Sequence, residues 1–567
     1  MDKLAEYVTS SAKSDAGWEL VLEFSSTHRC MPDEVVRGGH IIAAHLQKLG
    51  LKPIIHMPSL YLGIPVSAQI VLPHSTIKAK ASALSPAISN LKAPLIHLKA
   101  RSSKSRVHTD DPSQLFENTF ENEDDARKAI TGHIVLTEGL SNPARTLLLQ
   151  RWGAAAVIAI NPGDRSHWGT NSVIWGSPEE QETNLLPKIA SVAVSFDEGQ
   201  KLIQTAASGD QITLSVEALH GWFKQPVITL DIASADGCED FILLHSHYDS
   251  WEVGVGDNAT GNAVLLEVAR LLSQPELRLK RGVRICWWPG HSAGRYAGST
   301  WYADYFALEL EKNCVAHVNC DSPGCRDATS YASIRSNEVL GDLVKQTVAK
   351  LFHQQTEITH PGRAGDYSFY NLGISGCMLT SSMIPKAERE RRGWYDVGGC
   401  GGDPAWHSEF DTLEIADQNI LLNDVQLYSL LVLQLAQAER LPIQLTSAFE
   451  RIRLEITKLV ENLGERVNLG QINALLKEIP ELITALTLPD SKHFNEKARR
   501  AAQLMLRLSY TEKDSFAQDP ARALPFIPLL TPVRIASKPL SPEATPAAQR
   551  ALNRVQSALV QIADILR

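Results

Sequence analysis

The sequence predicts an α/β protein in which helices cover both faces of a mainly parallel sheet. Two observations carry this prediction. Apolar segments of strand length, among them FILLHSHYDS and RGVRICWW, alternate with amphipathic helical segments from residue 228 to residue 324. After about residue 443 the apolar pattern becomes helical throughout, which predicts a separate helical domain.

The elements before residue 225 divide into a helix and a β-rich unit. Residues 31–51 place apolar side chains on one helical side and end at Gly50. A Pro- and Ser-rich stretch at 53–103 then predicts short strands and loops. An α/β unit follows, with strands expected at 133–139, 154–162 and near 190 and helices at 143–153 and near 200.

The second α/β series begins at residue 228 and contains strands at 228–230, 241–250, 281–288 and 314–324. Helices are expected between them, at 258–274 and 299–313. We therefore divide the chain into an α/β domain (1–52 and 225–442), an inserted β-rich domain (53–224) and a C-terminal helical domain (443–567). In the last helix, apolar residues recur at steps of three and four, which fits core packing or a dimer contact: Leu552, Val555, Leu559, Ile562 and Leu566.

Composition excludes several classes of partner. The net charge is −9 and there is no long basic run, so no nucleic-acid partner is expected. No segment reaches the roughly 18–20 apolar residues that span a membrane, and the N-terminus lacks the apolar region of a secretory signal. The eight cysteines are scattered without a CxxC pair, as expected for reduced thiols. We expect a cytoplasmic protein.

Potential metal ligands follow several of the predicted strands. HSHYDS supplies His245, His247 and Asp249, which alternation along a strand would place on one side. Ligands of open α/β sheets bind beyond the carboxyl ends of strands, and imidazole with carboxylate suits zinc. Taken singly, each residue has a structural alternative: a core histidine, a helix cap, a turn residue or a surface histidine. The further candidates at or beyond such ends are Asp257, His291, Asp321 and His407.

Four segments resemble the co-catalytic zinc aminopeptidases, whose larger relatives include glutamate carboxypeptidases and proteins of transferrin-receptor-like architecture. They are HYDSWEVGVGDNATGNAVLLEVARLL, NCDSPG, AGDYSFYNLGISG and WHSEFDTLE, in the family's order. The resemblance implies that residues 53–224 are a protease-associated domain and that the C-terminal helices mediate homodimerisation. It also implies one or two zinc ions, although another divalent transition metal would suit the same ligands.

The resemblance also assigns roles to individual residues. It implies that His247, Asp257 and Asp321 hold one metal, and that Asp257 bridges to a second metal bound by His407. It gives Asp249 the role of orienting a metal-site imidazole, and Asp366 a similar supporting part.

One turn departs from the family pattern. Where the family carries two glutamates, a general base and a metal ligand, WPGHSAGRYAGSTW has His291 and Ser292 and no acidic residue. Three hypotheses follow. His291 replaces the lost ligand, or it transfers protons as the base or acid, or catalysis is lost and the chain is a dimeric binding or scaffold protein.

The remaining pocket residues are predicted from their position near these segments. Trp406 and Tyr367 are candidate substrate contacts, with core packing as their alternative. Arg295 and Arg363 are candidates for pairing with a substrate carboxylate, with structural salt bridges as the alternative. We predict a metallohydrolase that uses metal-activated water to cleave a peptide or amide C–N bond, and the altered turn favours a narrow, non-peptide amide.

Overall fold

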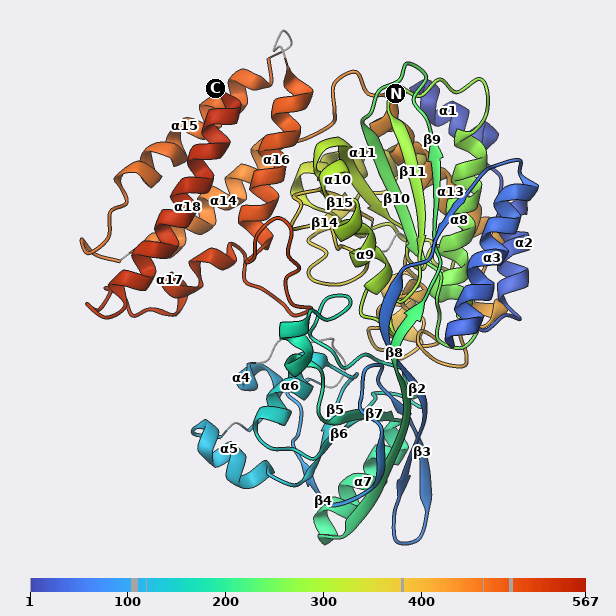
Figure 1. Ribbon diagram of the computed structural model, residues 1–567, viewed down its shortest axis with the longest axis vertical. Coiled ribbons are helices and arrows are strands. Elements are labelled where there is room, and N and C mark those ends of the chain that lie inside the picture. The colour runs from blue at the N-terminus through green and yellow to red at the C-terminus, as the bar shows by residue number, and fades with distance from the viewer. Residues whose placement is uncertain (1, 103–110, 119, 379–381, 462, 489–492) are drawn as a thin grey trace.

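The computed structural model describes residues 2–102, 111–118, 120–378, 382–461, 463–488 and 493–567. It has three parts (Figure 1): a layered α/β domain, a β-barrel below it, and a bundle of helices at its side. All eight cysteines are free thiols, as expected from their scattered positions.

A six-stranded mixed sheet forms the centre of the α/β domain. Strands β10, β11, β12 and β15 run parallel to one another, whereas β9 is antiparallel to both β1 and β11. The expected parallel arrangement therefore holds for the centre of the sheet but not for its β1–β9 edge. In spatial order the strands are β1 (Ile54–His56), β9 (Val227–Ile232), β11 (Gly282–Trp288), β10 (Phe241–His247), β12 (Cys314–Asn319) and β15 (Gly376–Cys377).

Helices cover both faces of this sheet, as predicted. Alternate residues of β10 point to opposite sides: Ile242 and Leu244 pack in one apolar core, and Phe241 and Leu243 pack in another. The first core is covered by α8 (Thr260–Leu272), α13 (Gln418–Gln437), α11 (Glu338–Phe352) and the N-terminal helices α1 (Asp2–Ser11), α2 (Asp15–Phe24) and α3 (Pro32–Lys48). The second is covered by α9 (Ala297–Tyr305) and α10 (Ala307–Asn313).

Helix α13 is the one helix in the described part of the chain that is long and apolar enough to cross a membrane. However, 72% of its apolar window is buried inside the structure, and its neighbours are α1, α8 and α11. Its apolar character is therefore explained by its place in the core.

The inserted segment forms a closed barrel from residue 59 onward; its predicted start at residue 53 is too early, because residues 54–56 form β1 of the α/β sheet. The strands of the barrel follow the order β2 (Ser59–Val71), β3 (Thr76–Ala81), β7 (Ala190–Val194), β6 (Ala156–Ile160), β5 (Ile134–Glu138), β4 (Ile88–His97) and β8 (Gln211–Lys224). The antiparallel ribbon of β2 and β8, paired from Ser59↔Lys224 to Val71↔Thr213, links the barrel to the α/β domain. Its larger helices are α5 (Glu123–Ile130), α6 (Pro143–Arg151) and α7 (Phe196–Ser208).

The C-terminal bundle uses its apolar stripe internally. The five residues of the last helix that recur at steps of three and four are at most 5% exposed within the single chain. The stripe therefore packs in the core of the bundle, and the alternative of a dimer contact through it is wrong. The bundle consists of α14 (Leu445–Val460), α15 (Gly470–Leu486), α16 (Phe494–Tyr510), α17 (Thr531–Ile535) and α18 (Thr545–Leu566).

Leu559→Ala is expected to lower the free energy of unfolding of the bundle by about 2–5 kcal/mol, the usual cost of a large-to-small change in a core. Leu559 is fully buried in α18. Urea denaturation followed by circular dichroism measures the change. The control is Gln561→Ala on the exposed side of the same helix, which should be near neutral. A Leu559→Ala protein that keeps full stability would contradict the packing described here.

Candidate metal centre

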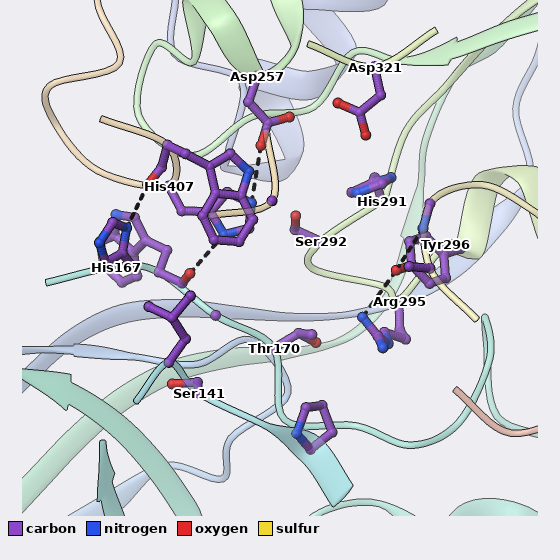
Figure 2. Close-up of a pocket in the computed structure, with 18 of the residues that line it drawn as sticks. Ser141, His167, Thr170, Asp257, His291, Ser292, Arg295, Tyr296, Asp321 and His407 are labelled. Carbon is purple, nitrogen blue, oxygen red and sulfur yellow. Dashed lines mark hydrogen bonds and ion pairs between the residues drawn. The ribbon is translucent and has the colours of Figure 1, made fainter. Parts of the chain in front are cut away.

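The predicted ligands meet at the carboxyl ends of the central strands. Figure 2 shows four of them, Asp257, His291, Asp321 and His407. His247 is the last residue of β10, and Asp257 lies in the turn that leads into α8. Asp321 follows β12, and His291 follows β11. His407 comes from the distant loop before α13. Since β10, β11 and β12 are parallel neighbours, their ends open at one edge of the sheet.

Asp257 lies between two imidazoles. Its Oδ1 is 3.1 Å from His247 Nε2, and its Oδ2 is 3.1 Å from His407 Nε2. Asp321 Oδ1 is 3.9 Å from the same His247 nitrogen. A carboxylate that offers one oxygen to each of two ligand groups is arranged as a bridge between two neighbouring cation positions.

The buried atoms of this centre fit a divalent metal ion. His247 Nε2 and Asp257 Oδ1 are both buried and make no hydrogen bond within the described residues, despite their short separation. Each of His247, His291 and Asp321 offers a ligand atom, and these three atoms lie within 4.8 Å of one another. Converging imidazole nitrogen and carboxylate oxygen without hydrogen bonds suits zinc.

The electrostatics of the centre favour positive charge. Burial lowers the pKa of His247, but the carboxylates of Asp249, Asp257 and Asp321 outweigh it and raise the pKa well above its usual value. Burial raises the pKa of Asp257, but the two neighbouring histidines hold it well below its usual range. A metal ion would satisfy the same carboxylates in place of the proton.

Asp249 ties the end of β10 to the altered turn. Its carboxylate accepts hydrogen bonds from the backbone N–H groups of His291 (3.1 Å) and Ser292 (3.4 Å). The same carboxylate lies 3.7 Å from His247 Nδ1, which also faces the Asp249 carbonyl at 3.0 Å. Asp249 thus fixes both an imidazole and the turn, which is the orienting position that the resemblance implies.

His291 is held by Asp366. The His291 Nδ1 lies 2.8 Å from Asp366 Oδ2, and Ser299 Oγ donates to the other oxygen of this buried carboxylate at 2.7 Å. The His291 ring stacks on His247 with centroids 3.8 Å apart. With Nδ1 engaged, Nε2 is the nitrogen left to face the centre.

The position of His291 changes one expectation. The resemblance implies that the family glutamate that binds metal shares its ion with the late histidine, which here is His407. His291 instead groups with His247 and Asp321, and in Figure 2 Ser292 is drawn between His291 and His407. If His291 is a ligand, it therefore belongs to the metal position of His247 and Asp321.

Residues of the inserted domain hold His407 in place. The sequence predicted His407 as a ligand but did not predict this contact. Trp168 N–H donates to the His407 carbonyl, and His407 Nδ1 donates to the Trp168 carbonyl, both at 2.8 Å. His167 Nδ1 donates to the Trp406 carbonyl at 2.6 Å, and His167 Nε2 lies 2.5 Å from the Tyr395 hydroxyl. The segment GDRSHWGT has no periodicity that would have marked it, because these contacts span 228 and 239 residues of sequence.

Asp411 also escaped prediction, although it lies in the WHSEFDTLE segment. It accepts hydrogen bonds from the backbone N–H groups of Gly256 (2.6 Å) and Asp257 (2.9 Å) and so fixes the backbone of the central carboxylate. Burial and the nearby charge of Asp257 raise the pKa of Asp411 to about 7.

The four predicted substrate contacts separate into two pairs. Trp406 and Arg295 line the cavity at the metal centre, although the Arg295 guanidinium is already bonded to the Tyr296 hydroxyl and the Ala521 carbonyl. Tyr367 is fully buried and lies outside that lining, as does Arg363.

Structural contacts account for most of the residues that lie away from the centre. Arg363 donates to the Asp519 and Pro520 carbonyls and lies over Trp175. Tyr367 packs edge-on against His317. His245, considered as a ligand, is buried in the core with its Nε2 3.0 Å from His317 Nδ1.

His167→Ala is expected to lower zinc affinity about 10- to 100-fold, the usual effect of removing an outer partner of a metal ligand. The substitution frees the loop that holds His407. Competition with a chromophoric chelator measures the affinity. The control is His74→Ala, an exposed histidine of the same domain. Unchanged zinc affinity in His167→Ala would show that the inserted domain does not support His407.

Comparison with known proteins agrees with this geometry. Residues 228–429 match the model of Peptidase family M28. Similar sequences include an aminopeptidase of Pseudomonas aeruginosa, 26% identical over 284 residues (47% of this chain and 51% of that protein), and aminopeptidase Y of Saccharomyces cerevisiae, 26% identical over 240 residues (40% and 42%). The chain spans about half the length of the curated relatives it matches.

Two solved structures share the fold. An aminopeptidase from Aneurinibacillus sp. strain AM-1 matches with a TM-score of 0.55 and 20% identity, over 78% of this chain and 98% of that one. A zinc aminopeptidase from Bacillus subtilis matches with a TM-score of 0.55 and 19% identity, over 75% and 96%. The residues that meet at the centre all lie within the segment that matches the family model: His247, Asp257, His291, Asp321 and His407.

Proposed function

We propose that the protein is a zinc-dependent hydrolase of a peptide or amide C–N bond, because residues 228–429 match the model of Peptidase family M28. The observation that carries the proposal is the buried carboxylate of Asp257, which offers one oxygen to His247 and the other to His407. The aminopeptidases among its relatives support the same reaction class.

The residues at the centre divide into two ligand sets. His247, Asp257 and Asp321, with His291 beside them, would hold one zinc ion, and Asp257 with His407 would hold a second. Zinc bound there would polarise the scissile carbonyl and lower the pKa of water. Asp249, Asp366 and the Trp168 carbonyl orient the three imidazoles.

The cavity offers few groups for proton transfer. Its described lining contains no glutamate, and its only carboxylates are Asp257 and Asp321. His291 is therefore the side chain best placed to hold or move a proton if it does not bind metal. The convergence of the ligands favours the enzyme over the non-catalytic scaffold.

The substrate is expected to be small. The inserted domain contributes Ser141, Pro143, Trp168 and Thr170 to the lining of the cavity. Figure 2 draws Ser141 and Thr170 on the side opposite Asp257 and Asp321. We propose that this domain limits the substrate to a short peptide or a narrow amide. Cytoplasmic location and homodimerisation stay predictions from the sequence.

The proposal is tested on purified protein, with metal content measured by inductively coupled plasma mass spectrometry. Aminoacyl p-nitroanilides, dipeptides and N-acyl amides are then assayed before chelation, after chelation and after zinc is restored. We expect stoichiometric metal and hydrolysis that chelation removes and zinc restores. Protein without stoichiometric metal, or zinc-loaded protein that leaves every substrate intact, would overturn the proposal.

A further inference from the structure

A second cavity of about 480 Å³ adjoins the metal centre. It lies between the α/β domain, which contributes Arg335, residues 359–364 and Tyr370, and the C-terminal domain, which contributes Arg451, Tyr510, residues 521–524 and Phe526. Arg335 and Ala364 line both cavities, so the two spaces share a wall. We call the second space the basic chamber.

The charged side chains that line the basic chamber are all positive. The lining includes Arg335, Arg363, Arg451 and Arg522, and it includes no aspartate or glutamate among the described residues. Burial lowers the pKa of His360 to about 3, so this histidine is neutral near pH 7. Aromatic and aliphatic side chains complete the walls: Tyr370, Tyr510, Phe526 and Leu524.

Two of these arginines have donors to spare. The Arg335 side chain makes no hydrogen bond or ion pair within the described part of the chain. Arg363 Nη1 is buried without a partner, while its Nη2 and Nε are bonded to backbone carbonyls. Arg451, by contrast, is paired with Glu338 and the Tyr510 hydroxyl.

An unpartnered guanidinium donor is costly when buried. The planar fork of arginine matches a carboxylate better than any neutral group, and such charge-assisted bonds are the strong ones. Arg335 stands at the junction of the two cavities. A ligand that reaches from the metal centre past Arg335 would bring its far end into the cavity that Arg363 also lines.

We propose that the basic chamber binds the carboxylate of an amide or peptide substrate whose C–N bond lies at the metal centre. This inference rests on the proposed hydrolase function and adds a substrate class to it. The neutral aromatic walls would carry the apolar part of the substrate between the two ends. The Arg335 side chain makes no hydrogen bond within the described structure and is therefore available to the substrate. Arg335 is then a specificity-determining residue.

The kinetic test compares matched substrates that differ only in a terminal carboxylate or primary amide, built on the best substrate found. We expect the wild type to prefer the carboxylate about 10- to 100-fold in kcat/KM, as one charge-assisted contact allows. Arg335→Gln should lower kcat/KM for the carboxylate substrate far more than for its neutral partner and so remove this preference, and Arg335→Lys should restore part of it.

Arg326→Gln is the control, because Arg326 lies in the connection that leads into β13 (Ser333–Arg335), the strand that Arg335 ends, but outside both cavities. It should keep the full preference. A wild type that treats carboxylate and amide alike, or an Arg335→Gln variant that keeps the preference, would overturn the chamber's role.

A binding experiment separates this inference from the proposed function. Hippurate and its neutral amide, hippuramide, are titrated into metal-free protein by calorimetry, so that no hydrolysis is needed. We expect hippurate to bind the wild type more tightly than hippuramide, and this difference to vanish in Arg335→Gln. Equal binding of the two probes to the wild type counts against the chamber, whether or not zinc-loaded protein is a hydrolase.

Discussion

Asp257→Asn is expected to abolish stable metal binding and to lower kcat/KM by roughly a thousandfold or more, a barrier increase of about 4 kcal/mol or above. Asp257 is the one described carboxylate that lies 3.1 Å from both His247 and His407. Asparagine keeps the shape of the side chain but loses its charge and one oxygen. Neither ligand set is then complete.

Metal content and kcat/KM are measured on the same preparation, and circular dichroism checks that the fold is retained. Asp327→Asn is the control, because Asp327 follows Asp321 in sequence but pairs with Arg392 at the surface. It should behave as the wild type. Asp257→Asn protein that retains wild-type metal content and turnover would show that Asp257 does not bridge the centre.

The central position of Asp257 shows what the sequence could predict. The strands β10, β11 and β12 are almost wholly buried, and a residue that can bind metal stands at or just beyond the end of each: His247, His291 and Asp321. Parallel strands bring such ends to one edge. The family resemblance supplied the order of the segments, and His247, Asp257, Asp321 and His407 are all found there.

Strand alternation did not predict which of the two histidines of β10 reaches the metal centre, because a residue outside the strand covers one of them. Alternation correctly places His245 and His247 on one face of β10, but the Phe369 ring covers His245 at 5.5 Å. Only His247, the last residue of the strand, reaches the open edge. Sequence periodicity carries no information on that covering segment, nor on the Trp168 carbonyl that holds His407.

The sequence also did not show which arginine lines which cavity. Arg363 was a candidate for a substrate carboxylate at the metal centre, yet it lies outside that cavity and faces the basic chamber. Arg335, which lines both cavities, had no motif to mark it. The walls of the chamber come from segments that are up to about 190 residues apart, and only the packing of the C-terminal bundle brings them together.

His291→Ala is expected to remove the metal of the His247–Asp321 position together with activity. The His291 Nδ1 is occupied by Asp366, and a ligand atom of His291 lies within 4.8 Å of those of His247 and Asp321. The carboxylate of Asp366 holds Nδ1 of this imidazole, and the ring faces two further ligands. This is the arrangement of a metal ligand. Metal content and kcat/KM are measured in parallel.

Asp366→Asn separates this role from proton transfer. If His291 binds metal, loss of the Asp366 charge should weaken metal affinity about 10- to 100-fold, less than the loss of His291 itself. Ser292→Ala, at the neighbouring position of the turn, should change metal content little. If His291→Ala instead keeps its full metal content and loses turnover, His291 moves a proton, and the pH dependence of kcat should lose one limb. Because the described lining has no glutamate to take over, either result would assign to His291 one of the two tasks that the family gives to a glutamate pair.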